Sequence, residues 1–113
     1  MNLEIIIEDR RKTLNVPDEI MAEAEAFFDK MDRDMDRGWQ MGPEFIEKPD
    51  QLDRCKIAAD KILIAIDTNN ENLLLMMAGY ILSRMPGVTG INIDTQGEMQ
   101  NTEIIMGHGG RIN

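Results

Sequence analysis

The chain has 113 residues, 42% of them hydrophobic and 29% charged, a composition that supports one folded domain rather than a disordered segment. Its 12 Lys and Arg residues against 21 Asp and Glu residues give a formal net charge of −9. This acidic balance argues against binding to nucleic acid or to an anionic membrane surface, because both depend on cationic side chains. Ten methionines and few aromatic residues predict a soft, aliphatic core.

Residues 3–16 are predicted to form a β-hairpin, because apolar and polar residues alternate on either side of a turn near Asp9. Pro17 then begins a first helix, which is expected to run to Arg37 and to end at Gly38. One face of this helix carries an apolar stripe and the other is strongly acidic. We expect the residues from Gly38 to Lys48 to form a loop.

A second helix is expected to begin at Pro49 and to end near Asp67, with Cys55 on its apolar stripe as a core residue. A third helix, residues 69–85, is apolar nearly all round. A helix with so narrow a polar side is typical of the buried centre of a domain.

The last third of the chain returns to alternating patterns, which predict strands over residues 88–94 and 102–106. The expected fold class is therefore α+β. A small, mostly antiparallel sheet made from the N- and C-terminal hairpins packs against three helices, in the order ββαααββ. Residues 1–106 form a single domain in this interpretation, and residues 107–113 form a flexible C-terminal tail.

The counts of reactive side chains exclude several chemistries. A single cysteine permits neither an internal disulfide nor a cysteine-based zinc site. The one histidine, His108, lies in the glycine-rich tail, a setting that rarely holds a catalytic base in place. We therefore expect no catalytic residues and no cofactor. The start of the chain is not signal-like, and no apolar run reaches the roughly 20 residues needed to cross a bilayer, which favours a cytoplasmic protein.

Asp32, Asp34 and Asp36 alternate before Gly38, and this spacing is similar to the first half of a calcium-binding loop. Two positions depart from that pattern. The glycine needed at the sixth position of the loop is replaced by Arg37, and the glutamate needed at the twelfth is replaced by a proline. The pattern therefore favours a helix end with paired charges, and the three aspartates are only weak candidates for metal ligands.

The acidic face of the first helix can be a solvated surface, or it can meet a basic protein partner. The loop that follows adds Trp39, which either covers the core or stays exposed as an anchor for a partner. The candidate partner-binding residues are Trp39, Met41, Asp32, Asp36 and Glu25.

The helices also carry candidates for self-association. Ile57 and Ile64 lie one heptad apart on the otherwise polar side of the second helix, so they need cover from another helix or another chain. The third helix adds a strip of residues, some of them small enough to allow close helix approach. The sequence predicts a homodimer formed through Ile57, Ile64, Met76, Gly79 and Ser83.

These observations favour a small, acidic, non-catalytic protein-interaction or regulatory module that associates with itself. The alternative is a small enzyme or ligand-binding protein that uses carboxylates in loops, with or without a divalent cation. The loop carboxylates are Glu44, Glu47, Asp67, Asp94 and Glu98. A third hypothesis is that the negative surface imitates nucleic acid and occupies a basic protein.

Overall fold

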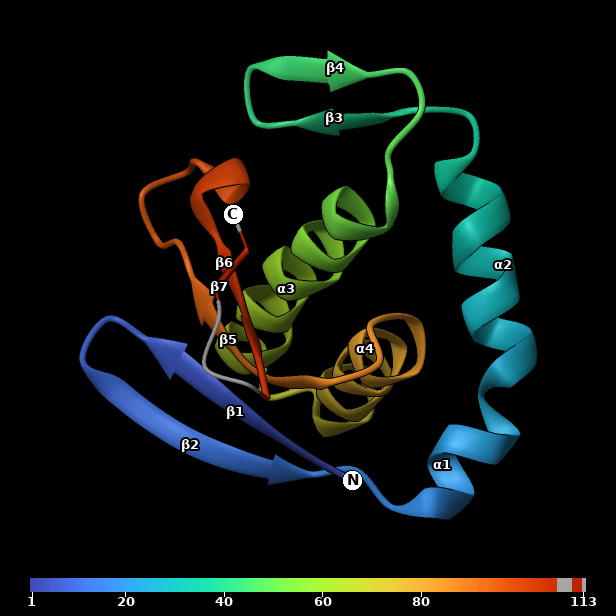
Figure 1. Cartoon of the computed structure of the whole chain (residues 1–113), viewed down its shortest axis with the longest axis vertical. Helices are drawn as coiled ribbons and strands as arrows, with labels where there is room; N and C mark the ends of the chain where they lie inside the picture. Colours follow the sequence, from blue (N-terminus) through green and yellow to red (C-terminus); the bar gives the residue numbers. More distant parts are fainter. Residues whose placement is uncertain (108–110, 113) are drawn as a thin grey trace.

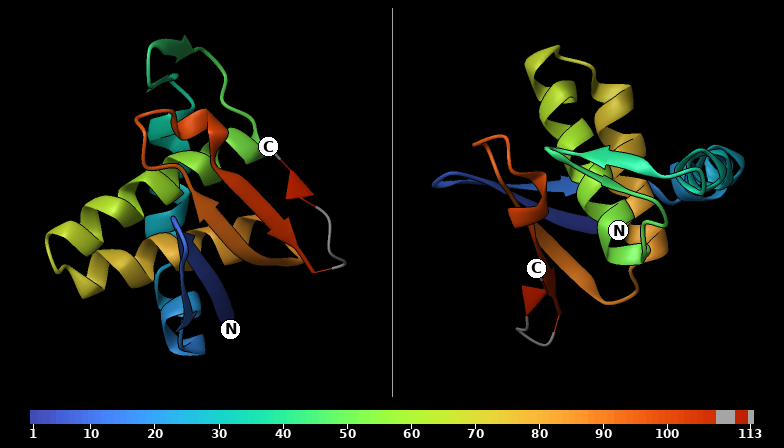
Figure 2. Two further views of the ribbon diagram at one scale, coloured as in Figure 1. Left: turned by 90° about the vertical axis from the view of Figure 1, so that its left-hand side faces the viewer. Right: turned by 90° about the horizontal axis from the view of Figure 1, so that it is seen from above.

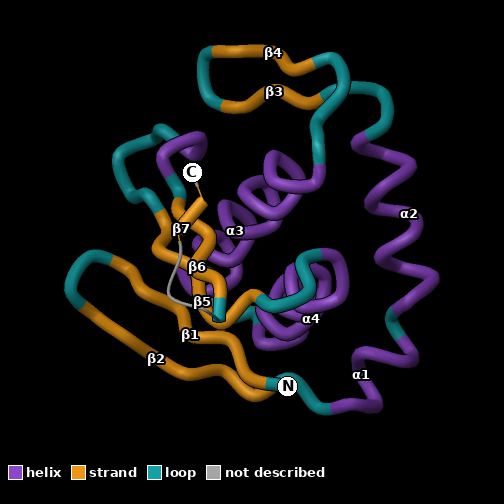
Figure 3. Tube along the Cα trace, viewed as in Figure 1, coloured by secondary structure: helices purple, strands orange, loops and turns teal. Residues whose placement is uncertain are grey.

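The computed structural model of the chain describes residues 1–107 and the backbone of residues 111–112. Within these residues the chain forms a five-stranded sheet, a separate two-stranded hairpin, four α-helices and one short 3-10 helix (Figure 1 and Figure 3). The elements in chain order are β1 Asn2–Ile7, β2 Arg10–Asn15, α1 Asp18–Glu23, α2 Glu25–Met35, β3 Trp39–Met41, β4 Glu44–Ile46, α3 Gln51–Asp67, α4 Glu71–Arg84, β5 Val88–Ile93, η1 Met99–Asn101, β6 Glu103–Met106 and β7 Arg111–Ile112.

The strands of the main sheet lie in the order β2-β1-β5-β6-β7. β1 and β5 are parallel, and every other pair of neighbours in this sheet is antiparallel. The predicted N-terminal hairpin is the β1–β2 pair, whose turn places Glu8 in the left-handed region with a φ of 57°. The α+β fold class with a mostly antiparallel sheet is therefore confirmed.

The α3 and α4 helices form an antiparallel pair next to the sheet (Figure 1 and Figure 2). α3 begins with a reciprocal cap, in which the Asp50 side chain accepts a hydrogen bond from the Asp53 backbone at 2.8 Å and the Asp53 side chain accepts one from the Asp50 backbone at 3.1 Å. In α4 the run of residues 77–82 is buried, as its all-round apolar pattern predicts.

The prediction of one continuous helix from Pro17 to Arg37 is wrong. The chain breaks at Ala24, which has a φ of −90° and a ψ of 2°, and α1 and α2 run in different directions on either side of it (Figure 1). Ala24 is buried at this break and α1 packs against α4. The bend lets both helices direct apolar side chains inward, and neither proline nor glycine marks it in the sequence.

The predicted loop after Gly38 instead contains the β3–β4 hairpin. Gly38 has a φ of 93°, a conformation that favours glycine, and a Cβ atom there would lie 2.5 Å from the Phe45 ring. Trp39 pairs with Ile46 across the hairpin. Each strand has three residues, too few for an alternating pattern to be recognised in the sequence.

The segment expected to be a flexible tail contributes a strand to the sheet. Arg111 and Ile112 form β7, which pairs with β6 in an antiparallel arrangement. The remaining residues after Gly107, His108 among them, lie outside the described part of the chain.

Candidate functional site

The acidic residues of α2 contact two arginines of the same chain. Four acids, spaced by four, three and four residues, share one face of the helix: Glu25, Asp29, Asp32 and Asp36. Arg84, from the end of α4, contacts the first three at 2.9 Å each, and Arg54, from α3, contacts the last two at 3.3 and 2.7 Å. The face that the sequence suggested for a basic partner therefore meets the protein's own arginines.

Asp32 is the centre of this network. Its side chain is 26% exposed and accepts hydrogen bonds from the Tyr80 hydroxyl, Arg84 Nε and Arg54 Nη1. Burial opposes ionisation of the carboxyl group, but the hydrogen bonds and the charge of Arg84 outweigh it and lower the pKa of Asp32. Burial, together with the neighbouring carboxylate, raises the pKa of Tyr80. Both groups therefore keep one protonation state near neutral pH, which suits a structural role.

The three aspartates of the calcium-like segment, Asp32, Asp34 and Asp36, do not point toward a common centre. Asp32 and Asp36 contact the arginines, whereas Asp34 accepts a hydrogen bond from Lys30 at 3.0 Å on the exposed side. Residues two apart in a helix point about 200° away from each other, so alternate aspartates cannot surround one ion while the segment stays helical. Among the described residues, no group of three or more His, Cys, Asp or Glu side chains is placed to hold a metal ion.

Trp39 and Met41 do not form one exposed surface to which a partner protein could bind. Met41 is fully buried, so it cannot contact a partner of the folded chain. Trp39 is half-buried and packs against the core, while its ring lies 5.1 Å from Lys61 Nζ. Trp39 therefore covers the core and keeps one accessible side next to a cation.

The residues predicted for self-association do not form one surface. Ile57 is 1% exposed because α3 is covered by α4 and also by β5, β6 and η1. Gly79 is buried, and a Cβ atom there would lie 3.0 Å from the Phe28 ring. The close helix contact that this glycine permits is therefore between α4 and α2 of the same chain. Ile64 is 51% exposed, whereas Met76 and Ser83 are half-buried. Of the five residues, only Ile64 is strongly exposed.

Cys55 lies in the core, as predicted, and burial raises the pKa of its thiol to about 12. The thiolate, which is the reactive form, is therefore scarce at neutral pH. We expect the native protein to resist Ellman's reagent at about pH 8, where an exposed thiol reacts readily. The same assay in denaturant should release one equivalent of the coloured product. Rapid labelling without denaturant would contradict the buried position.

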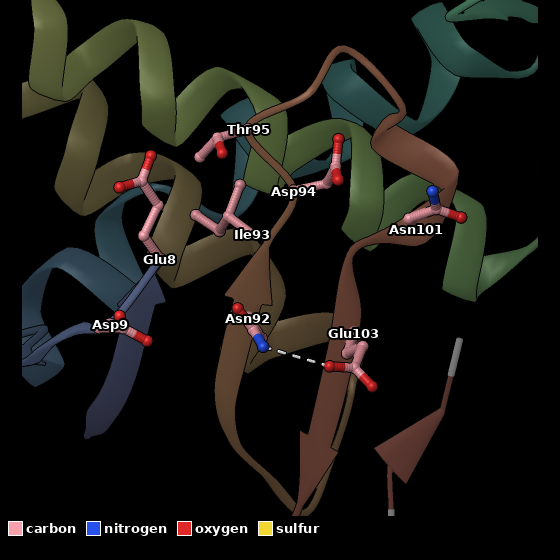
Figure 4. Close-up of a pocket in the computed structure, with 8 residues that line it drawn as sticks. All are labelled: Glu8, Asp9, Asn92, Ile93, Asp94, Thr95, Asn101 and Glu103. Atoms are coloured by element: carbon pink, nitrogen blue, oxygen red, sulfur yellow. Dashed lines mark hydrogen bonds between the residues drawn. The ribbon is translucent and has the colours of Figure 1, made fainter.

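A polar pocket of about 300 Å³ lies where the parallel strands β1 and β5 end (Figure 4). Asp94 accepts hydrogen bonds there from the backbone of Gln96 and Glu98 at 3.0 and 2.8 Å, and Glu103 accepts one from Asn92 at 3.2 Å. Of the five loop carboxylates considered in the sequence, only Asp94 lines it. The lining residues are Glu8, Asp9, Asn92, Ile93, Asp94, Thr95, Asn101 and Glu103. The pocket repels anions, and two of its carboxylates already stabilise the loop and the strand pair.

A larger hollow of about 550 Å³, the hairpin groove, lies between the β1–β2 hairpin and the adjoining ends of α3 and α4. β2 is the edge strand, and the hairpin projects beyond the two helices (Figure 1 and the right-hand view of Figure 2). One side of the sheet is therefore left uncovered at this edge. Side chains from both layers make the apolar part of the lining: Ile5, Ile7, Leu14, Leu63, Ile66 and Leu74.

Cations of β2 line the same groove. Side chains alternate along a strand, so Arg10, Lys12 and Leu14 share the side on which β1 places its apolar residues. Arg11 also lines the groove, but it forms an ion pair in which its Nη1 atom lies 3.3 Å from Glu4 Oε1. In the described part of the chain, neither Arg10 nor Lys12 has a carboxylate oxygen within 4.0 Å.

Sequence reasoning missed the hairpin groove, although a signal for it was present. Residues 10–12 are the only three consecutive cations in a chain whose net charge is −9. The run follows directly after the predicted turn at Asp9, so the local pattern indicates a turn and a strand but not a charged surface. Its apolar complement comes from residues more than 50 positions later, on α3 and α4.

None of the helices in residues 1–107 combines the length and the apolar character needed to span a bilayer. No family model matches the chain, and the comparisons with curated proteins and with solved structures also give no match.

Proposed function

We propose that this protein is a non-catalytic protein-interaction module that binds an acidic amphipathic helix in the hairpin groove. The observation that carries the proposal is the combination of an apolar floor with two cations, Arg10 and Lys12, that have no carboxylate partner within the described part of the chain, at a sheet edge that the protein's own helices leave uncovered. A helix laid on this edge would extend the helix layer over the sheet. Helix-in-groove recognition of this kind uses apolar side chains at i, i+3, i+4 and i+7 as anchors.

The apolar part of the groove supplies a driving force for binding. Ile66 is 41% exposed, and Ile7, Leu14, Leu63 and Leu74 are half-buried, so all five can lose further contact with water. Each Å² of apolar surface removed from water contributes about 25 cal/mol before the entropic cost of association is subtracted. A partner that fills the groove with leucine-sized side chains would gain most from this term.

The charge of the groove selects the partner. The lining holds three cations, Arg10, Arg11 and Lys12, and two acids, Glu8 and Asp67, but Arg11 is already paired with Glu4. Arg10 and Lys12 lie opposite the apolar Ile7 and Ile5, and among the described residues neither has a carboxylate oxygen within 4.0 Å. Acidic residues flanking the partner's apolar stripe would pair with Arg10 and Lys12, and they would raise the association rate more than the final affinity.

The engagement of the reactive side chains supports a non-catalytic role. The Cys55 thiol is buried, and the Tyr80 hydroxyl and the Asp32 carboxylate are bound to each other. The alternative function, based on loop carboxylates, has support from the polar pocket at the ends of β1 and β5, but Asp94 and Glu103 there are already hydrogen-bonded.

The proposal can be tested with a fluorescein-labelled peptide of about 18 residues, five turns of helix, that carries leucines at i, i+3, i+4 and i+7 and glutamates beside them. Fluorescence anisotropy is expected to show saturable binding that weakens as salt is added. The double variant Arg10→Glu, Lys12→Glu reverses the charge of the groove and should weaken binding at least about tenfold. The matched control is Arg33→Glu, Lys48→Glu, which changes the net charge equally at exposed positions outside the groove.

A peptide with the same leucines and with lysines in place of the glutamates distinguishes charge recognition from unspecific adhesion. Equal binding of both peptides, or no binding of either, would contradict the proposal. Light scattering of the protein alone tests self-association. A dimer mass that returns to the monomer mass in Ile66→Asp would show that the groove takes a second copy of the chain instead of a separate acidic helix.

A further inference from the structure

A second apolar opening, the α2 cleft, lies between α2 and the α3–α4 pair. Its main part has a volume of about 230 Å³ and is lined by Phe27, Lys30, Met31, Asp34, Lys61, Leu73 and Met77. A smaller hollow of about 40 Å³ shares three of these residues and adds Met35 and Trp39. The cleft has no residue in common with the hairpin groove. The helix α2 and the β1–β2 hairpin, which supply the other walls of the two openings, lie on opposite sides of the α3–α4 pair (Figure 1).

The lining of the cleft is adaptable and apolar at its base. Met77 is 1% exposed and Met31 is 9% exposed, while Phe27 keeps 38% of its surface accessible at the wall. Methionine side chains are flexible and polarisable, so they can adjust to ligands of different shape. A ligand with an apolar body would cover Phe27 and contact both methionines.

The charges at the cleft favour an anion. Lys30 is bound to Asp34 at 3.0 Å, so these two side chains largely neutralise each other. Lys61 lies over the Trp39 ring, and in the part of the chain that the structure describes it has no carboxylate oxygen within 4.0 Å. Its ammonium group is therefore available for an ion pair directly beside the apolar lining.

We propose that the α2 cleft binds a small amphipathic carboxylate, whose carboxylate group pairs with Lys61 and whose apolar body lies against Phe27, Met31 and Met77. The space is below the roughly 300–1,000 Å³ of pockets for drug-sized ligands, which restricts the ligand to a short aliphatic chain or a single ring. A charge-assisted hydrogen bond to Lys61 at the edge of the cleft would fix the orientation of the ligand.

Trp39 makes the cleft directly observable, because it is the only tryptophan of the chain and lies beside Lys61. Sodium octanoate, kept below its micelle concentration, is expected to change the Trp39 emission in a saturable way. 1-Octanol, which has the same chain and no charge, should bind about tenfold more weakly, and octylammonium should give no saturable change. Isothermal titration calorimetry provides a second readout that does not depend on Trp39.

The variant Lys61→Met removes the charge and keeps an apolar stem, so octanoate should bind about tenfold more weakly while 1-octanol binds as before. Lys48→Met is the matched control, because it makes the same change at an exposed position outside the cleft. Absence of saturable octanoate binding would overturn the proposal. It would also be overturned by equal affinities for octanoate and 1-octanol, or by equal losses in Lys61→Met and Lys48→Met.

Discussion

Replacing Asp32 with asparagine is expected to lower the free energy of unfolding by about 3 kcal/mol, because it leaves two partly buried arginines without their shared carboxylate. Asp32 accepts hydrogen bonds from Tyr80, Arg84 and Arg54, and both arginine side chains are at most 16% exposed. The remaining acids around these arginines are more than half exposed, so water screens their interaction. Urea denaturation followed by circular dichroism measures the change.

Asp34→Asn is the matched control for this variant. Asp34 lies two residues further along the same helix and forms an exposed pair with Lys30. Its replacement should change the free energy of unfolding by no more than about 0.5 kcal/mol, as is usual for exposed pairs. Equal effects of the two variants would show that the network around Asp32 does not contribute specifically to stability.

The stabilising effect of Asp32 should also depend on pH. Because the native contacts lower the pKa of Asp32, the folded state binds a proton at this site less readily than the unfolded state. The stabilisation is therefore fully present above the pKa of the unfolded chain, at about 4, and is lost as the pH falls through the lower pKa of the folded chain. The stability difference between the native protein and Asp32→Asn should be constant near neutral pH and should shrink below about pH 4.

Ile57→Asp is expected to unfold the protein at room temperature. Ile57 is 1% exposed, so the variant loses core packing worth about 2–5 kcal/mol and places a carboxyl group where nothing compensates its burial. Together these two losses are comparable to the free energy of unfolding of a typical domain, which is about 5–15 kcal/mol. Far-ultraviolet circular dichroism and a urea titration should show loss of the cooperative transition.

Ile64→Asp provides the control on the same helix, one heptad away. Ile64 is 51% exposed, and its replacement should change the free energy of unfolding by at most about 0.5 kcal/mol. The sequence assigned both isoleucines to one intermolecular surface, which predicts two folded variants. A folded Ile57→Asp variant would support that interpretation and contradict the buried position of Ile57 in the core.

Local patterns account for the parts of the fold that the sequence predicted. The alternation at the start of β1 reflects burial of Leu3 and Ile5 between the more accessible Asn2 and Glu4, and the all-round apolar pattern of α4 reflects a helix buried on most sides. The break at Ala24 and the short β3–β4 hairpin have no comparable signature. The break depends on α1 packing against α4, more than 45 residues away, and the hairpin strands are too short to show a period.

The same distinction applies to the candidate sites. The spacing of Glu25, Asp29, Asp32 and Asp36 showed that they share a helix face, but not what that face meets. Their partners come from distant parts of the chain, and Asp32 and Arg84 are 52 residues apart. The sequence therefore identified a strongly charged surface, whereas only the packing of α2 against α3 and α4 shows that the charges are used internally.

By itself the sequence determined the fold class, the position of the buried helix and the unreactive setting of Cys55, because burial on one or more sides imposes a period on consecutive residues. Only the tertiary structure decided which charges remain available and where apolar surface stays accessible. Arg54 and Arg84 form ion pairs with the acids of α2. In contrast, no carboxylate among the described residues pairs with Arg10, Lys12 or Lys61. These properties depend on contacts between elements far apart in the chain, and no local period records such contacts.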